Sequence, residues 1–195
     1  MAKRLQQEYM KIELAVAGLW PESFKRACAQ CTEICCRPHM AEEVFESDWL
    51  QAISTKAHGN WFEEKDRHPN CKALGQKGCV LTHGKPPFCT SFYCDKLLTG
   101  QSPRDLVCHL FLSNILSTLC KLDKKHNLQE LPKSEWRAHR DKIAANIERA
   151  KIHLDWVKQF KTATDDAKIE PAFRMLVEMP ALLTTGVRRV LQHQH

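Results

Sequence analysis

The spacing of apolar residues near the N-terminus predicts an amphipathic helix. Over residues 2–19, hydrophobic side chains recur at alternating steps of four and three, which places them on one helical face: Leu5, Tyr9, Ile12, Val16 and Leu19. Pro21 follows and is expected to end this helix. A shorter helix is predicted over 47–57, where Ser47 has the residue type of an N-cap. Its inner side carries Trp49, Leu50 and Ile53.

After residue 100 the apolar pattern becomes helical over long stretches. Ser102, Pro103 and Asp105 supply an N-cap, a first-turn proline and a first-turn acid. The apolar positions that follow repeat at i, i+4 over a wide face: Val107, Phe111, Ile115 and Leu119. A second long helix is predicted over 134–161 from apolar residues at steps of four and three: Ile143, Ile147, Ala150, Leu154 and Val157. We expect these two helices to pair as a hairpin, and two shorter helical segments to follow on either side of Pro180.

The region between the helical parts lacks such periodicity. Residues 58–70 are polar and contain both glycine and proline, which predicts a loop. Residues 71–81, CKALGQKGCVL, contain two short runs joined by a turn at Gly75 and Gly78. This arrangement predicts a small β-hairpin with a cysteine near each end.

Length and composition favour a globular fold. The chain has 195 residues, 43% of them hydrophobic and 27% charged, which suits a packed domain and excludes long disorder. We predict a mainly α protein in two parts. Residues 1–100 form a small, irregular cysteine-cluster, metal-binding module with a short β-hairpin and an N-terminal helix. Residues 101–195 form a helical, bundle-like scaffold packed on it, so that the two parts make one compact unit.

The N-terminal sequence bears on the compartment. Glu8, Lys11 and Glu13 stand where a secretion signal would have an unbroken apolar run. The longest stretch without Asp, Glu, Lys or Arg, residues 106–120, is shorter than a membrane-spanning helix and is interpreted as a buried core helix. We therefore expect a cytoplasmic protein without a membrane partner. In the reducing cytosol, clustered cysteines are more often metal ligands than disulfides.

Ten cysteines are the most informative feature of the composition. Eight of them lie within residues 28–94 and are the candidate metal ligands: Cys28, Cys31, Cys35, Cys36, Cys71, Cys79, Cys89 and Cys94. The first four form a CxxCxxxCC group, in which the CxxC spacing lets two thiolates turn toward one ion. Eight thiols suit two four-thiolate Zn²⁺ sites, or one iron–sulfur cubane with spare cysteines. The other two, Cys108 and Cys120, lack partners at ligand spacing and are expected in the core.

The adjacent pair Cys35 and Cys36 bears on the kind of metal. In a helix the two side chains differ in direction by about 100°, and in a strand they face opposite sides. One ion therefore does not readily take both thiolates, which favours an iron–sulfur cluster slightly, although four thiolates suit either metal. The histidines of this region are interpreted as structural rather than as ligands: His39, His58, His68 and His83.

The order of these cysteines resembles the YkgJ-like cysteine-cluster family, described as zinc- or iron-chelating domains. The likeness covers residues 28–94 and consists of CAQCTEICC, then CKAL, then CVLTHGKPPFC. Three residues rather than two precede the cysteine pair, and Lys85-Pro86 stands where the family has Arg-Pro. The resemblance implies a chelated zinc or iron centre in this region. Some relatives are described as flagellin lysine N-methylases, which implies an iron–sulfur-dependent enzyme as an alternative.

Three functions are thus open from the sequence. The first is a metal-binding protein that holds zinc or an iron–sulfur cluster, with a protein partner docked on the C-terminal helices. The second is an enzyme similar to the flagellin lysine N-methylases, although no GxGxxG, HExxH or GxSxG motif identifies catalytic residues. The third is a zinc module that binds nucleic acid. The chain has a net charge of +6, but the cysteine region does not carry this surplus: residues 28–94 contain seven basic and eight acidic side chains. A module that binds phosphates there would need a basic surface, so the charge distribution argues against this function.

Overall fold

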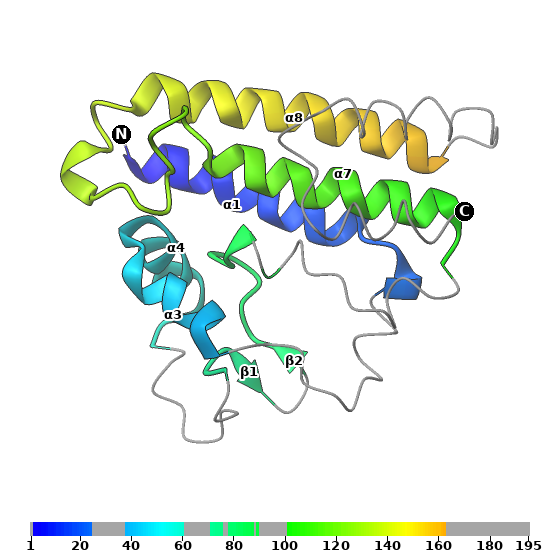
Figure 1. The fold of residues 1–195 in the computed structure, drawn as a ribbon, viewed down its shortest axis with the longest axis horizontal. Coiled ribbons are helices and arrows are strands. Elements are labelled where there is room, and N and C mark those ends of the chain that lie inside the picture. Colours follow the sequence, from blue (N-terminus) through cyan, green and yellow to red (C-terminus); the bar gives the residue numbers. More distant parts are fainter. Residues whose placement is uncertain are drawn as a thin grey trace.

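Three long helices lie side by side and form the main body of the protein (Figure 1). They are α1 (Ala2–Leu19), α7 (Pro103–Cys120) and α8 (Arg140–Thr162). This computed structural model describes residues 2–24, 38–60, 71–75, 78–87, 89 and 101–162. Over these residues the protein is mainly helical, which confirms the predicted α class.

Helix α1 has the bounds that the apolar spacing predicts. Tyr9, Ile12 and Val16 are buried, at 1–2% exposed, and Tyr9 contacts Cys120 of α7 through its hydroxyl. The two outer members of the predicted stripe, Leu5 and Leu19, are half-buried against the same core. The helix is therefore held by its apolar face, as the sequence indicates.

Helix α7 is the central element of the core. Ser102 caps its N-terminus by accepting a hydrogen bond from the Asp105 backbone N–H at 3.1 Å, with Pro103 in the first turn, as predicted. Every residue from Leu106 to Leu116 is buried, so the helix has no outward face over three turns. Cys108 and Cys120 are each 1% exposed, which confirms that they are core residues. Of the helices in the described ranges, none combines the length and apolar composition that a membrane span requires.

Helices α7 and α8 pair as the predicted antiparallel hairpin, but α8 begins later than the sequence indicates. The predicted start at 134 is wrong, because a 3₁₀ turn, η2 (Lys133–Glu135), precedes the helix and α8 begins at Arg140. The cause is Trp136. Its indole N–H donates to the Leu131 carbonyl at 3.2 Å, and its ring meets that of Trp49 edge-on at 5.0 Å. Tertiary packing of this side chain thus overrides helix propensity.

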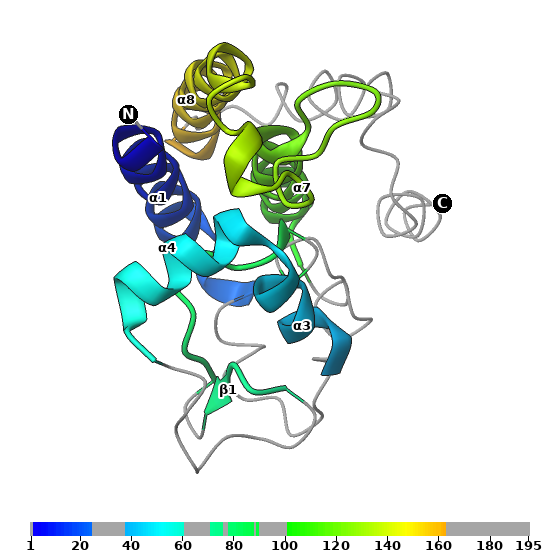
Figure 2. The same cartoon turned by 90° about the vertical axis from the view of Figure 1, so that its left-hand side faces the viewer.

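A second, smaller layer lies beneath the three helices (Figure 2). It contains α3 (Pro38–Glu46) and α4 (Asp48–His58), and α4 has the predicted cap, since Ser47 accepts from the Leu50 backbone N–H at 3.2 Å. Its inner residues Trp49, Leu50 and Ile53 are fully buried, as predicted.

Helix α3 was not predicted. Its nine residues do carry a helical apolar repeat, since Met40 and Ala41 are followed four residues later by Val44 and Phe45, but the stretch is too short to show more than one such repeat.

Two strands of two residues each, β1 (Leu74–Gly75) and β2 (Gly78–Cys79), pair antiparallel. Leu74 opposes Cys79 and Gly75 opposes Gly78. The cysteine-cluster module as a whole and the division at residue 100 stay predictions. The predicted loop beyond residue 60 and the helical segments around Pro180 lie outside the described residues.

The end of α7 depends on one amide from α8. Asn146, which is 5% exposed, donates from Nδ2 to the carbonyls of Lys121 at 2.8 Å, Thr118 at 3.2 Å and Leu119 at 3.4 Å. Thr118 and Leu119 lie in the last turn of the helix and Lys121 is its C-cap residue, a region where carbonyls lack the usual helical partner; the Thr118 carbonyl also accepts from the Lys121 N–H at 3.2 Å. Asn146 therefore joins the two members of the hairpin through their backbone as well as their side chains.

We expect Asn146→Ala to lower the free energy of unfolding by about 1–3 kcal/mol, because buried carbonyls would lose their donor. Arg149→Ala, an exposed position on the same helix, is the control and should change stability little. Urea unfolding followed by circular dichroism measures both. Equal effects of the two substitutions would show that the amide does not hold the end of α7.

Candidate metal centre

Three of the eight predicted ligands lie in the described part of the chain. Cys71 precedes β1 and is 7% exposed, Cys79 lies in β2 and is exposed, and Cys89 is half-buried. None of the three forms a disulfide. Five predicted ligands lie outside the described residues: Cys28, Cys31, Cys35, Cys36 and Cys94.

The three described thiols share one electrostatic environment. Burial is the main cause that raises the pKa of Cys89 to about 12, and Lys85 acts in the opposite direction. Cys79, Cys71 and Glu43 raise the pKa further through their charges, so each lies within electrostatic reach of the Cys89 sulfur. These groups are up to 46 residues apart in sequence and lie in one region of the structure, but among the described residues the three thiols do not form a group whose ligand atoms all lie within 4.8 Å of one another.

Backbone hydrogen bonds fold the chain between Cys71 and Cys79 back on itself. The Leu74 N–H donates to the Cys71 carbonyl at 2.9 Å, and the Val80 N–H donates to the Ala73 carbonyl at 2.8 Å. The Cys71–Leu74 turn precedes one strand of the pair, and Cys79 lies in the other strand, opposite Leu74. Two thiolates carried in this way can be presented to one ion or cluster.

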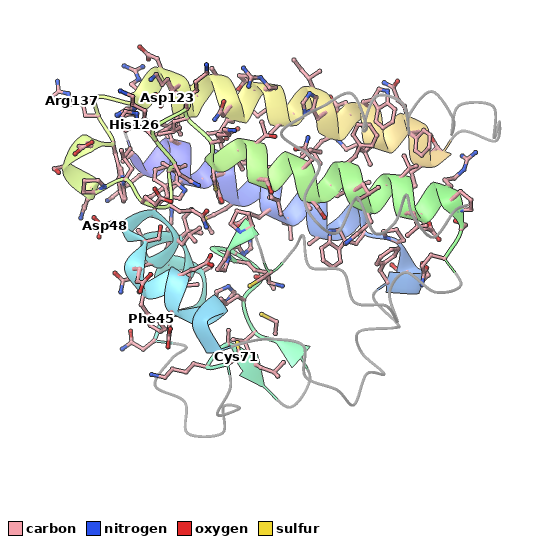
Figure 3. All side chains as sticks on the ribbon, viewed as in Figure 1. Phe45, Asp48, Cys71, Asp123, His126 and Arg137 are labelled. Atoms are coloured by element: carbon pink, nitrogen blue, oxygen red, sulfur yellow. The ribbon has the colours of Figure 1, made fainter. Side chains whose placement is uncertain are left out.

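Helix α3 lies beside this turn. The Lys72 ammonium sits 5.9 Å from the centre of the Phe45 ring, a cation–π contact between the turn and α3. Figure 3 shows Cys71 and Phe45 in this lower layer, below the three long helices. Glu43, whose charge acts on Cys89, comes from the same helix.

Gly84 places the segment between Cys79 and Cys89 against α4. Its φ is +68°, and a Cβ atom there would lie 2.7 Å from the Leu50 carbonyl oxygen and 2.8 Å from the Ser54 nitrogen. Only glycine allows this close approach of backbone to helix. The route of the chain toward Cys89 is fixed at this point.

A buried carboxylate from α1 holds the same segment. Glu13 is 5% exposed and accepts hydrogen bonds from the Gly84 N–H at 2.9 and 3.0 Å, and from the Lys85 N–H at 3.2 Å. Burial raises the pKa of Glu13 to about 8, and these two N–H groups and the Lys85 charge oppose the rise. A polar contact therefore couples the main helical body to the chain that carries Cys79 and Cys89.

His58 has the structural role that the sequence favoured. Its Nε2 atom, at the end of α4, accepts from the backbone N–H groups of Thr82 at 3.2 Å and His83 at 3.3 Å. The lone pair that a metal would need is thus used by the backbone. Burial lowers the pKa of both His58 and His83, and the neighbouring His83 adds to the effect on His58. His39 and His68 are not among the residues whose side chains the structure describes.

One group of potential ligands was not predicted from the sequence. Asp123, His126 and His139 bring a carboxylate oxygen and two imidazole nitrogens within 4.8 Å of one another. A weak signal was present, since Asp123 and His126 are three residues apart just after a helix. His139 comes from a different turn, so only the tertiary structure assembles the group.

Comparisons with known proteins add no relative. No protein-family model, no curated protein and no solved structure matches this chain. The resemblance to the YkgJ-like cysteine-cluster proteins therefore stays a prediction from the cysteine spacing. Function has to be argued from the residues themselves.

The two glycines with positive φ provide a matched pair of substitutions. Gly59→Ala, with φ of +60° and open space around the Cβ position, should lower the free energy of unfolding by about 1–2 kcal/mol from backbone strain alone. Gly84→Ala should lower the free energy of unfolding by about 1–3 kcal/mol more than Gly59→Ala does, because its Cβ would overlap α4. Thermal unfolding of both variants measures the difference. A loss in Gly84→Ala no greater than in Gly59→Ala would contradict the close packing of this segment.

The raised pKa of Glu13 has a consequence for stability. Between its ordinary value of 4.5 and about 8, the carboxyl is ionised in the unfolded chain and protonated in the folded one. Folding then takes up a proton, so the wild type loses about 1.4 kcal/mol per pH unit as the pH rises through this window. Glu13→Gln has no such dependence, and its stability relative to the wild type should increase from pH 5 to pH 8.

Glu8→Gln on the same helix is the control. Hydrogen bonds with Lys11 and Lys151 lower the pKa of Glu8 to about 2. Glu8 is therefore ionised in both the folded and the unfolded chain above pH 5, and it does not change the pH dependence of the unfolding free energy there. Urea unfolding at four pH values from 5 to 8 compares the three proteins. Parallel curves for Glu13→Gln and the wild type would show that this carboxyl titrates normally.

Proposed function

We propose that this chain is a metal-binding protein in which cysteine thiolates between residues 28 and 94 hold Zn²⁺ or an iron–sulfur cluster. The observation that supports the proposal most is the shared environment of Cys71, Cys79 and Cys89. The charges of Cys71 and Cys79 act on the Cys89 thiol, although these three residues lie on different segments of the chain and not on one regular element. Free cysteines that merely fill a core do not need such an arrangement.

The charge balance of this environment also supports a cation. The Cys89 thiol is half-buried, and the neighbouring thiols and Glu43 oppose its ionisation. A bound metal ion supplies the positive charge that allows several thiolates to coexist at short distance. Metal binding would therefore displace the thiol protons, and its affinity would depend on pH.

The helices supply the support that such a centre needs. Glu13 from α1 and His58 from α4 bind the backbone of residues 82–85, and Gly84 packs directly on α4. The ligand-bearing chain is thus attached by polar backbone contacts, with Ala73 and Leu81 as its buried apolar residues. A metal would provide the remaining constraint on this segment. The C-terminal scaffold then serves to position the centre and to offer helical surface to a protein partner.

The experiment is anaerobic purification of the full chain, with an absorption spectrum and elemental analysis for iron, zinc and sulfide on one sample. We expect bound metal in the wild type, and loss of at least half of it in Cys71→Ser and Cys89→Ser, because each removes a thiolate ligand. Cys108→Ala is the control, since this cysteine lies in the core on α7 and should leave the metal content unchanged.

The same sample separates the two metals. A coloured protein with iron and sulfide indicates a cluster, and a colourless protein with zinc indicates thiolate sites. A wild-type protein without metal, or one in which the Cys71 and Cys89 variants retain all of it, would contradict the proposal. Circular dichroism of each variant verifies that the helical body is folded.

A further inference from the structure

We propose that Asp123, His126 and His139 form a second metal site, for a divalent transition ion such as Zn²⁺, independent of the cysteines. The site lies where the connection after α7 meets the turn before α8. Figure 3 shows Asp123 and His126 at the end of the helical body, and Cys71 in the lower layer well away from them. The inference rests on no cysteine and does not depend on the function proposed above.

The donor atoms are close to coordination distance. One oxygen and two imidazole nitrogens lie within 4.8 Å of one another, and the two imidazole rings are 4.8 Å apart between centroids. Ligands at about 2.0–2.1 Å from one Zn²⁺ ion are separated by roughly 3–3.5 Å. Small side-chain rotations on this surface would bring the three groups onto one ion.

The backbone holds two of the ligands in a fixed relation. Asp123 Oδ1 accepts from the backbone N–H groups of Lys125 and His126, each at 2.9 Å, and lies 2.9 Å from His126 Nδ1. The chain also closes on itself here, since the His126 carbonyl accepts from the Leu122 N–H at 3.0 Å. The pair is therefore ordered before any ion binds, which lowers the entropic cost of binding.

The third ligand has an unused nitrogen. His139 Nδ1 is buried and has no hydrogen-bond partner among the described residues. A buried ring nitrogen without a partner is costly in a folded protein, and an ion coordinated there would satisfy it. The ring of His139 already faces that of His126, at an angle of 48°.

The competitor for this site is Lys142 on α8. Its ammonium pairs with Asp123 Oδ2, while Oδ1 accepts from the backbone N–H groups of Lys125 and His126 and lies against His126 Nδ1. Both carboxylate oxygens thus already have partners, and an ion bound at Oδ2 has to displace the lysine. Removing the lysine charge should strengthen metal binding, an effect opposite in sign to loss of a ligand.

The donor set defines the class of ion. Two imidazoles and one carboxylate suit borderline ions such as Zn²⁺, Co²⁺ and Ni²⁺, whereas Mg²⁺ and Ca²⁺ prefer oxygen ligands throughout. Three protein ligands leave at least one position of a tetrahedral ion for water or for a group from a partner.

Calorimetric titration with Zn²⁺ tests the site on the full chain as purified, with any metal on its cysteines in place. The wild type should bind one further equivalent. His139→Ala and His126→Ala should each weaken this binding by about tenfold or more, and Lys142→Met should tighten it. His153→Ala, on α8 but outside the group, is the control and should bind as the wild type.

A spectroscopic measurement keeps the test decisive if a histidine variant folds poorly. In long-range ¹⁵N spectra of the wild type, Zn²⁺ should shift the ring nitrogens of two histidines, and these signals should be the ones missing from His126→Ala and His139→Ala. The proposal fails if the wild type takes up no further Zn²⁺, if His139→Ala binds as tightly as the wild type, or if Lys142→Met does not bind more tightly. The metal content of the cysteines, measured separately, stays unchanged in all these variants.

Discussion

The burial of α7 on all sides is the constraint on which the rest of the structure depends. A helix without an outward face has to be surrounded, and of the described helices α8 packs most extensively against it, whereas α1 packs mainly on α8 and touches α7 less. Even His109 lies within this core, stacked on Phe24 at 4.4 Å, and burial lowers its pKa to about 3, so it is neutral. Burial of this much apolar surface is the main favourable term in folding.

The lower layer is attached to this body by a different kind of interaction. Helix α4 joins through aromatic packing, in which Trp49 meets Tyr9 and Trp136 edge-on. The chain toward Cys89 is held by Glu13 and His58, which bind its backbone N–H groups. Hydrogen bonds of this kind orient the backbone segment that they hold, and they contribute less to the free energy of folding than burial of apolar surface does. This explains why a bound metal would matter for the cysteine-bearing segment and much less for the three long helices.

The two proposed metal sites differ in chemistry as well as in place. Thiolates of the lower layer suit zinc or an iron–sulfur cluster, and they would be ordered largely by the metal. The group at the end of the helical body consists of oxygen and nitrogen donors that the fold already orders. A lysine occupies one carboxylate oxygen there, so the affinity for an ion is set by competition between two cations.

Local signals along the chain predicted the helices that have repeating apolar residues or clear caps. Helix α1 has its predicted bounds, and Ser47 and Ser102 cap the helices as their residue types indicate. Such features depend on neighbours a few residues away in the chain. The metal that the cysteine spacing predicts stays a prediction, and the spacing leaves its identity open because the same thiolates suit more than one metal.

Features that depend on residues far apart in the chain became visible only in the folded protein. The start of α8 shifted because Trp136 packs on Trp49, and Glu13, an unremarkable residue in a helical pattern, is the buried partner of Gly84. His139 joins Asp123 only because α7 and α8 pair as a hairpin. Packing partners and the shared environments of ionisable groups arise from contacts between residues far apart in the chain. The periodicity of apolar residues in the sequence does not reveal such contacts.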